Sequence, residues 1–230
     1  MSKRMTIAID GPAASGKSTL AKKLAEQIGF LYFDTGVMYR AITLVALERG
    51  IDLEDADACT ALAESVRIDI DPPTKDRRLY DVLIDGDDKT WEIREPDVDA
   101  NVSLVSTYPG VRQALTRQQR RIGLSGDVVM VGRDIGTVVM PDAEIKLYLD
   151  ATVEERARRR FIDMLARGEE VELEDVLASM RMRDQLDSAR DLAPLKPAED
   201  ARVLDSNNKS EEEVLEEVLR LVEEHQLEIS

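Results

Sequence analysis

The chain has 230 residues, 43% hydrophobic and 34% charged, which is enough to bury the core of one domain carrying a sizeable insertion. This composition excludes intrinsically disordered and collagen-like proteins, and the formal charge of -16 at pH 7 argues against binding to nucleic acid or to an anionic membrane surface. The single cysteine, Cys59, and the single histidine, His225, exclude disulfides, zinc sites made of Cys and His, and catalytic triads that need an interior histidine.

The start of the chain has two basic residues but only a short apolar run, and no stretch of about 18 apolar residues occurs anywhere. We therefore expect no signal peptide, no transmembrane helix and a cytoplasmic location. Cys59 is expected as a small buried residue, and His225 as an exposed residue of a C-terminal helix.

Short apolar runs alternate with helical patterns along most of the chain. Residues 5–9 predict a buried strand, and the spacing of Leu20, Leu24 and Ile28 predicts a helix that stops at Gly29. A strand over residues 30–33 and a helix over about residues 37–48 are predicted next. Further strands are predicted at residues 128–131, 145–149 and 203–204. This alternation indicates an α/β fold with a parallel sheet covered on both faces by helices.

Two later helices have predicted start signals. Thr152 with Glu155 forms a capping box before an arginine-rich helix, and Ser210 with Glu213 forms one before a last amphipathic helix. Both helices are therefore expected to begin directly after these caps.

The middle of the chain breaks this alternation. Val66, Ile68 and Ile70 are separated by polar residues, and the run over residues 79–84 ends at Asp85-Gly86, which together predict a hairpin. We therefore place an antiparallel or mixed insertion at residues 61–107, within a core domain formed by residues 1–60 and 108–230. Trp91 is expected to pack inside this insertion.

Residues 11–18 (GPAASGKS) match the phosphate-loop pattern G-x-x-x-x-G-K-[ST] directly between a predicted strand and a predicted helix. Backbone N–H groups of such a loop surround a phosphate, and the N-terminus of the following helix adds partial positive charge. Lys17 is expected to reach the β and γ phosphate oxygens, and Ser18 to be a ligand of Mg²⁺. The residues expected to bind ATP are Gly11, Pro12, Ala13, Ala14, Ser15, Gly16, Lys17, Ser18 and Thr19.

Arginines are concentrated in one half of the chain. Of the 22 arginines, 13 fall between residues 112 and 190, a stretch whose net charge is only -1. Planar guanidinium groups bind phosphate bidentately, so this stretch suggests a site for several phosphates. A helix surface with many ion pairs is the alternative, and both interpretations remain open for Arg156, Arg158, Arg159 and Arg160.

The phosphate loop and six further segments resemble the bacterial cytidylate kinases, a family of P-loop nucleoside monophosphate kinases. These segments are residues 34–40 (DTGVMYR), 111–112 (VR), 132–139 (GRDIGTVV), 141–143 (PDA), 183–195 (ending in APL) and 203–206 (VLDS). The resemblance covers nearly the whole chain. It implies ATP-dependent phosphorylation of CMP and dCMP to CDP and dCDP by in-line transfer, in pyrimidine nucleotide metabolism. It also implies a five-stranded parallel sheet flanked by helices, an enlarged insertion for the acceptor, and a mobile lid, which we place at about residues 152–170.

Site residues follow from the same resemblance. It implies acceptor phosphate contacts for Thr35, Arg40, Arg133 and Arg190, cytosine contacts for Ser103, Arg112 and Asp134, and sugar contacts for Arg183 and Asp187. A carboxylate opposite the cytosine amine, with an arginine and a hydroxyl opposite the base acceptors, fits the edge of cytosine. Lys17, Arg133 and Arg190 are expected to surround the transferring phosphoryl group. Two departures are visible, because Thr35 replaces a common serine and because Leu186 and Ser188 stand where some members have arginines.

Two other functions stay open at this point. The chain could phosphorylate a different small acceptor, such as a metabolite with a hydroxyl group, or it could be a nucleotide-binding switch with little turnover. Residues 208–211 (NKSE) nearly match the N-K-x-D motif of GTPases, although a helix start explains them equally well. We further expect a monomer whose partners are ATP and CMP or dCMP, with no nucleic acid and no membrane among them.

Overall fold

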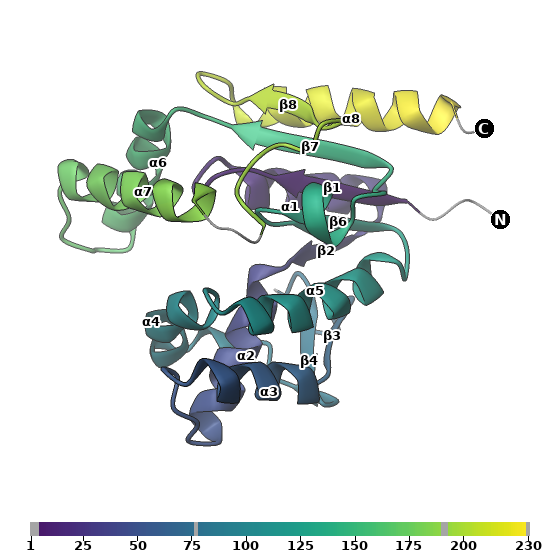
Figure 1. Ribbon diagram of the computed structural model, residues 1–230. Coiled ribbons are helices and arrows are strands. Elements are labelled where there is room, and N and C mark those ends of the chain that lie inside the picture. Colours follow the sequence, from purple (N-terminus) through teal and green to yellow (C-terminus); the bar gives the residue numbers. More distant parts are fainter. Residues whose placement is uncertain (1–4, 76–77, 190–192, 229–230) are drawn as a thin grey trace. The chain divides into compact units, whose positions relative to one another are not determined.

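The computed structural model describes residues 5–75, 78–189 and 193–228. Its main sheet has five strands in the order β2-β6-β1-β7-β8 (Figure 1). β1 and β7 pair in parallel with Ile9 opposite Leu147, and β7 and β8 pair in parallel with Leu149 opposite Leu204. The strands are β1 (Thr6–Asp10), β2 (Leu31–Asp34), β6 (Val128–Val131), β7 (Ile145–Asp150) and β8 (Arg202–Asp205). The predicted five-stranded parallel sheet is confirmed.

The central strands are apolar because both of their faces are covered. Every residue of β1 and of β6 is buried, and the sequence of β6 is VVMV. Continuous β-branched runs of this kind are typical of parallel sheets with helices on either side. The helices are α1 (Lys17–Ile28), α2 (Gly36–Glu48), α3 (Ala56–Ser65), α4 (Pro96–Val105), α5 (Pro109–Gly123), α6 (Val153–Ala166), α7 (Leu173–Ser188) and α8 (Glu211–Glu228). A 3₁₀ turn spans Glu92–Arg94, and a π-helical turn spans Ile135–Val139.

The chain forms two compact units. The first comprises the described part of residues 1–6 and 29–130, and the second that of residues 7–28 and 131–230. In the first unit, α3 packs on α5 and α2 packs on α4. In the second, α1 packs on α8 and α6 packs on α7. The boundaries of the insertion at residues 61 and 107, and of the lid at about residues 152–170, stay predictions.

A small second sheet lies in the first unit. Its strands β3 (Ile68–Asp71), β4 (Asp81–Ile84) and β5 (Asp87–Asp88) are antiparallel, in the order β3-β4-β5. Asp85 and Gly86 connect β4 to β5 with φ values of 51° and 95°, as a tight two-residue hairpin requires. The predicted hairpin is therefore confirmed.

The expectation that Trp91 packs inside the insertion is wrong. Trp91 is 54% exposed, and the guanidinium of Arg78 lies over its ring at 5.4 Å from the centroid. The neighbouring apolar side chains Ile93 and Val98 are fully buried instead. The indole therefore lies at the surface, where a cation covers one face of the ring.

The single cysteine and the single histidine have different outcomes. Cys59 is fully buried on α3, as expected. His225 lies on α8 as expected, but it is half-buried, and its Nε2 atom is buried without a partner among the described residues. The expectation of an exposed histidine is wrong, because α8 turns this position partly toward the protein interior.

The two predicted capping boxes form to different extents. Ser210 and Glu213 exchange both bonds, with Ser210 N donating to Glu213 Oε2 at 2.7 Å and Glu213 N donating to Ser210 Oγ at 3.2 Å. Thr152 Oγ1 accepts from Glu155 N at 3.3 Å, but Thr152 N donates to Asn207 Oδ1. The box of Thr152 and Glu155 is thus only half formed, because the Glu155 carboxylate binds arginines of α6 instead.

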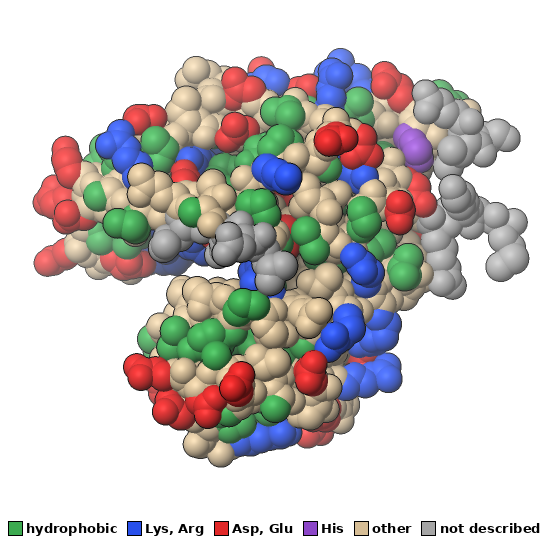
Figure 2. Space-filling model, viewed as in Figure 1, with side chains coloured by type: hydrophobic (Ala, Val, Ile, Leu, Met, Phe, Trp, Pro, Cys, Tyr) green, Lys and Arg blue, Asp and Glu red, His purple; other side chains and the backbone are tan. Residues whose placement is uncertain are grey.

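Charge is unevenly spread over the second unit. Figure 2 shows acidic side chains gathered at the left of the view, over the connection between α6 and α7, where Glu169, Glu170 and Glu172 are exposed. Four arginines of α6 instead lie in its first half, at positions 156, 158, 159 and 160, whereas Arg167 caps the end of the helix beside this connection. In the described part of the chain, no helix is long and apolar enough to cross a membrane.

Candidate functional site

The phosphate loop connects β1 to α1 in the second unit, where the sequence predicted it. Gly11 has a φ of 144°, and a Cβ atom on it would lie 2.1 Å from the carbonyl oxygen of Leu149 on β7. Ala14 and Gly16 also have positive φ, of 57° and 94°. Residues with positive φ between residues of ordinary conformation turn successive N–H groups toward a common centre, and such a loop binds anions.

Gly11→Ala is expected to destabilise the chain by about 3 kcal/mol or more, because the methyl group meets the Leu149 carbonyl and the backbone conformation is unfavourable. Urea unfolding measures the change. Gly29→Ala is the matched control, since Gly29 has a φ of 74° and no atom within 4 Å of its Cβ position. It should cost only about 1 kcal/mol, and equal losses in the two variants would contradict the role of the close approach.

Lys17 is the first residue of α1 and is 6% exposed. Its Nζ donates to Pro12 O at 2.5 Å and to Ser15 Oγ at 3.5 Å. These contacts hold a positive charge over the loop and beside the N-terminus of α1. The two charge sources together favour a bound anion with several negative oxygens.

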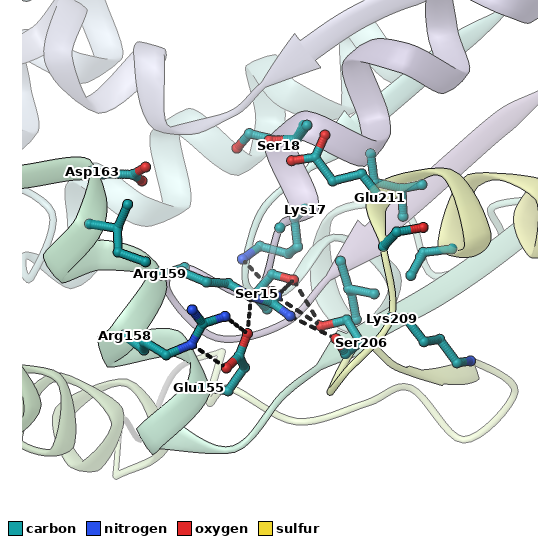
Figure 3. A pocket seen from close by; sticks show the side chains of 18 residues that line it. Ser15, Lys17, Ser18, Glu155, Arg158, Arg159, Asp163, Ser206, Lys209 and Glu211 are labelled. Carbon is teal, nitrogen blue, oxygen red and sulfur yellow. Dashed lines mark hydrogen bonds and ion pairs between the residues drawn. The ribbon is translucent and has the colours of Figure 1, made fainter. Parts of the chain in front are cut away.

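A cavity of about 530 Å³ opens beside the loop, within the range of small-molecule sites (Figure 3). Ser18 and Thr19 line it on the side of α1, and Leu149, Ile162 and Val214 supply apolar wall. The connection from β8 to α8 closes another side with Ser206 and Lys209. A flat apolar group and a polyphosphate could therefore both be accommodated here.

The four clustered arginines of α6 have different positions. Arg156 is buried, donates to Ala13 O at 3.1 Å and pairs bidentately with Asp184 of α7. Arg158 and Arg159 line the cavity and both bind Glu155 (Figure 3), whereas Arg160 is exposed and outside the lining. Arg156 therefore has a structural place between helices, and only two of the four can face a ligand in this cavity.

Arg159 joins the two polypeptide segments that border the cavity. Its Nη1 donates to Ser15 O at 3.4 Å and to Ser206 Oγ at 3.2 Å, and its Nη2 donates to Ser206 O at 2.7 Å. Ser206 Oγ in turn donates to Ser15 O at 3.3 Å. The guanidinium thus lies next to the phosphate loop in a fixed geometry.

The segment after β6 reaches the other side of the loop. Arg133 Nε donates to Asp187 Oδ2 at 2.9 Å, and Arg133 Nη1 donates to Gly11 O at 3.3 Å. Asp134 and Asp187 are both buried, whereas Arg183 of α7 is exposed. Within the second unit the structure therefore brings Arg133 and Asp187 together at the start of the phosphate loop. The predicted site residue Arg190 lies outside the described residues.

Asp10 is a residue of this site that the sequence analysis missed, since it counted only as part of an Asp-Gly turn. Its carboxylate is buried and accepts the N–H groups of Ile135 and Gly136, each at 2.7 Å. Burial raises the pKa of Asp10 to about 6, against the lowering effect of these two bonds. A buried strand that ends in an acid next to a phosphate loop was the available signal.

Four predicted acceptor residues belong to the first unit. Thr35 is buried before α2, and Arg40 of α2 donates to Ile93 O at 3.3 Å and forms an ion pair with Asp99. Arg112 of α5 donates to Ser106 O at 3.4 Å, with its guanidinium 5.6 Å from the ring centroid of Tyr39, and Ser103 of α4 is exposed. These four predicted residues therefore lie on α2, α4 and α5 and directly before α2.

A second cavity, of about 300 Å³, lies in the first unit and includes Arg40. Asp34, Tyr80, Arg94 and Asp99 also line it, and the sequence analysis missed these contributions. Burial raises the pKa of Tyr80 to about 12, and the charge of Asp34 acts in the same direction. Tyr80 is therefore a neutral hydroxyl beside two arginines at physiological pH.

Comparison with known proteins identifies the family. A model of the family described as cytidylate kinase matches residues 7–224. The chain belongs to the cytidylate kinase family. Named cytidylate kinases are similar over most of their length: that of Herpetosiphon aurantiacus is 50% identical over 218 residues, covering 94% of this chain and 93% of that protein. The one of Bacillus licheniformis is 46% identical over 224 residues, covering 97% and 98%.

Membership of the cytidylate kinase family confirms the resemblance seen in the sequence. Among solved structures, a shikimate kinase from Acinetobacter baumannii in complex with shikimate superposes with a TM-score of 0.50. It is 17% identical and covers 98% of this chain and 96% of its own. At that identity the likeness supports the shared kinase fold and nothing about the substrate.

The donor set near the phosphate loop suits a magnesium ion that is held mainly by water and phosphate oxygens. Ser18 is exposed at the first turn of α1 and lines the cavity. Among the residues that the structure describes, no group of three or more His, Cys, Asp or Glu side chains is arranged to hold a metal ion. Mg²⁺ keeps several waters and commonly has one or two protein ligands beside substrate phosphates, so a single hydroxyl fits it.

Proposed function

We propose that the chain transfers the γ-phosphoryl group of ATP to CMP and dCMP, giving ADP with CDP or dCDP. The observation that carries this proposal is the phosphate loop, with Lys17 held over it beside a cavity of about 530 Å³, in a chain that the cytidylate kinase family spans from residue 7 to residue 224. The relatives named above bear the same activity in their names. We further propose a cytoplasmic monomer that acts in pyrimidine nucleotide metabolism.

On the donor side, residues 11–19 would bind the phosphates of ATP through backbone N–H groups and through Lys17. Ser18 would hold Mg²⁺, which neutralises charge on the donor phosphates when it is bound. Arg158 and Arg159 would contact the donor, because they are the two arginines of α6 that line the cavity. Arg156 would instead keep α6 and α7 together through Asp184.

On the acceptor side, nine residues would bind CMP. The phosphate would contact Thr35, Arg40, Arg133 and Arg190, the base Ser103, Arg112 and Asp134, and the sugar Arg183 and Asp187. Asp134 is buried, and a dry carboxylate that accepts from the cytosine amine would repel the oxygen of uracil at the same position. This carboxylate would therefore set the choice of base.

Phosphoryl transfer of this type requires little covalent chemistry from the protein itself. The attacking group is an ionised phosphate oxygen, so no general base is needed, and a chain without a histidine in the site suffices. Lys17, Arg133 and Arg190 would neutralise charge that develops on the transferring group. Arg133 is bonded to Asp187 and Gly11, which keeps its guanidinium at the start of the phosphate loop.

Arg159→Ala is expected to raise KM for ATP about tenfold and to change KM for CMP little. The reason is that a charge-assisted hydrogen bond to ATP is lost, while the contacts to CMP are kept. Steady-state kinetics with each substrate varied in turn measures this. Arg160→Ala is the matched control, since Arg160 is the next residue on α6 and does not line the cavity. A larger effect of Arg160→Ala than of Arg159→Ala would contradict the assignment.

Steady-state kinetics at fixed Mg-ATP with CMP, dCMP, UMP and AMP tests the proposed function as a whole. CMP and dCMP should be phosphorylated efficiently, and UMP and AMP poorly. Efficient transfer to a hydroxyl-bearing metabolite instead, found by coupled ADP assays with a panel of acceptors, would replace the proposal by the alternative kinase activity. Slow GTP hydrolysis without an acceptor would favour a switch, although residues 208–211 start α8 through the Ser210 and Glu213 cap.

A further inference from the structure

Asp10 is the last residue of β1 and stands directly before Gly11, where the phosphate loop begins. Its Oδ1 accepts from Ile135 N and its Oδ2 from Gly136 N, both at 2.7 Å. These donors are the first two residues of the π-helical turn that follows residues 133–134. An aspartate that only shaped its own turn would bond to backbone two or three residues away, whereas these bonds span 125 and 126 residues.

Keeping this carboxylate in the interior is energetically unfavourable, because the residue is only 3% exposed. Asp134 adds to that cost, while the two N–H groups and the charge of Lys17 offset part of it. A neutral asparagine would be less costly to bury, but it has one acceptor oxygen and would set its NH₂ group against an N–H donor. The pair of bonds therefore requires a carboxylate at this position.

The same segment is also held through a side chain. Arg133 Nη1 donates to the carbonyl of Gly11 at 3.3 Å, and its Nε donates to Asp187 at 2.9 Å. Asp10 and Gly11 are consecutive. Asp10 fixes the backbone of residues 135–136, just after Asp134, and the carbonyl of Gly11 accepts from the guanidinium of Arg133, just before Asp134. Loss of the Asp10 bonds would free that backbone to shift, and the two side chains would shift with it.

We infer that Asp10 is a positioning residue that sets Arg133 and Asp134 for the acceptor nucleotide. This inference rests on the proposed function, in which these two residues contact the phosphate and the base of CMP. Asp10 acts through the backbone of residues 135–136. Donor binding depends on the phosphate loop and α6, and is therefore expected to be largely independent of Asp10.

Calorimetric binding of CMP alone and of ADP alone to the full chain tests this inference. In Asp10→Asn we expect the affinity for CMP to fall about tenfold or more and that for ADP to stay within about twofold, since small misplacements of contacting groups have large effects. The preference for CMP over UMP should shrink as well, because the same bonds set Asp134. A purely structural role would lower both affinities together and leave the base preference unchanged.

Two further variants make the outcome decisive. Asp10→Glu keeps the charge but moves the carboxylate by one methylene, and it should show the same split between CMP and ADP. Asp81→Asn is the matched control: Asp81 is also 3% exposed and binds Arg78 at 2.9 Å, so the variant should lower thermal stability without changing the ratio of the two affinities.

Parallel loss of CMP and ADP affinity, unchanged CMP affinity, or failure of both Asp10 variants to fold would each overturn the inference. The unchanged protein is measured beside them. If it binds no CMP, the proposed function is wrong and the inference is wrong with it. If it binds CMP and the Asp10 variants bind CMP equally well, only the inference is wrong.

Discussion

Replacing Lys17 by alanine is expected to lower kcat for CMP phosphorylation by about a thousandfold while the chain stays folded. The ammonium is nearly buried and lies over the phosphate loop, with Pro12 O at 2.5 Å and Ser15 Oγ at 3.5 Å. Because it stands where negative charge develops during transfer, its removal raises the barrier more than it weakens substrate binding. Coupled ADP assays measure kcat, and circular dichroism with thermal unfolding checks the fold.

Lys22→Ala is the matched control, because Lys22 is an exposed lysine of the same helix. It should leave kcat within about twofold, as expected of a surface charge away from bound phosphate. Turnover of Lys17→Ala close to that of the unchanged protein would remove the phosphate loop from the mechanism.

Asp134→Ala is expected to lower kcat/KM for CMP by about 100-fold, because a buried charge-assisted bond to the cytosine amine is lost. UMP gains nothing from that bond and is freed from the repulsion by the carboxylate, so the preference for CMP over UMP, on the order of 10⁴ in a dry pocket, should shrink by at least the same factor. Kinetics with CMP and UMP under identical Mg-ATP measures the ratio.

Asp134→Asn sharpens this prediction, since an amide can donate to the uracil oxygen and should bring UMP closer to CMP than alanine does. Asp142→Ala is the control for loss of one negative charge, because Asp142 is exposed. An unaltered ratio of CMP to UMP in Asp134→Ala would refute its assignment as the residue that reads the base.

The main sheet and the phosphate loop could be predicted because their signals are local. Each strand is a short apolar run, and the loop is a continuous motif with a strand before it and a helix after it. Helices α3, α4 and α5 were not predicted, although their starts carry signals: Asp55 caps α3 by accepting from Asp57 N and Ala58 N, and Pro96 and Pro109 open the other two. The apolar patterns of α3 and α4 are weak beside the alternating strands of the same region, whereas α5 carries a clear helical pattern in Val111, Ala114, Leu115 and Ile122 that was overlooked.

The distribution of roles among the arginines could not be predicted. Helical spacing places Arg156 and Arg159 on the same face of α6, but it does not say which of the two lines the cavity beside the phosphate loop. The bonds of Arg156 to Asp184 and of Arg159 to Ser206 decide this, and both join residues far apart in the chain. Asp10 was missed for the same reason, since its partners lie more than a hundred residues away.

The half-formed cap at the start of α6 has a mechanical consequence. Thr152 N is bonded to Asn207, and Arg159 two turns later is bonded to Ser206, so the base of α6 is pinned to the connection between β8 and α8. The far end of the helix pair is the exposed connection that contains Glu169 and Glu170, with Arg167 beside them. Any rotation of α6 and α7 must therefore take place about this base. The arginines beside the phosphate loop would then be displaced least, and the acidic connection at the far end would be displaced most.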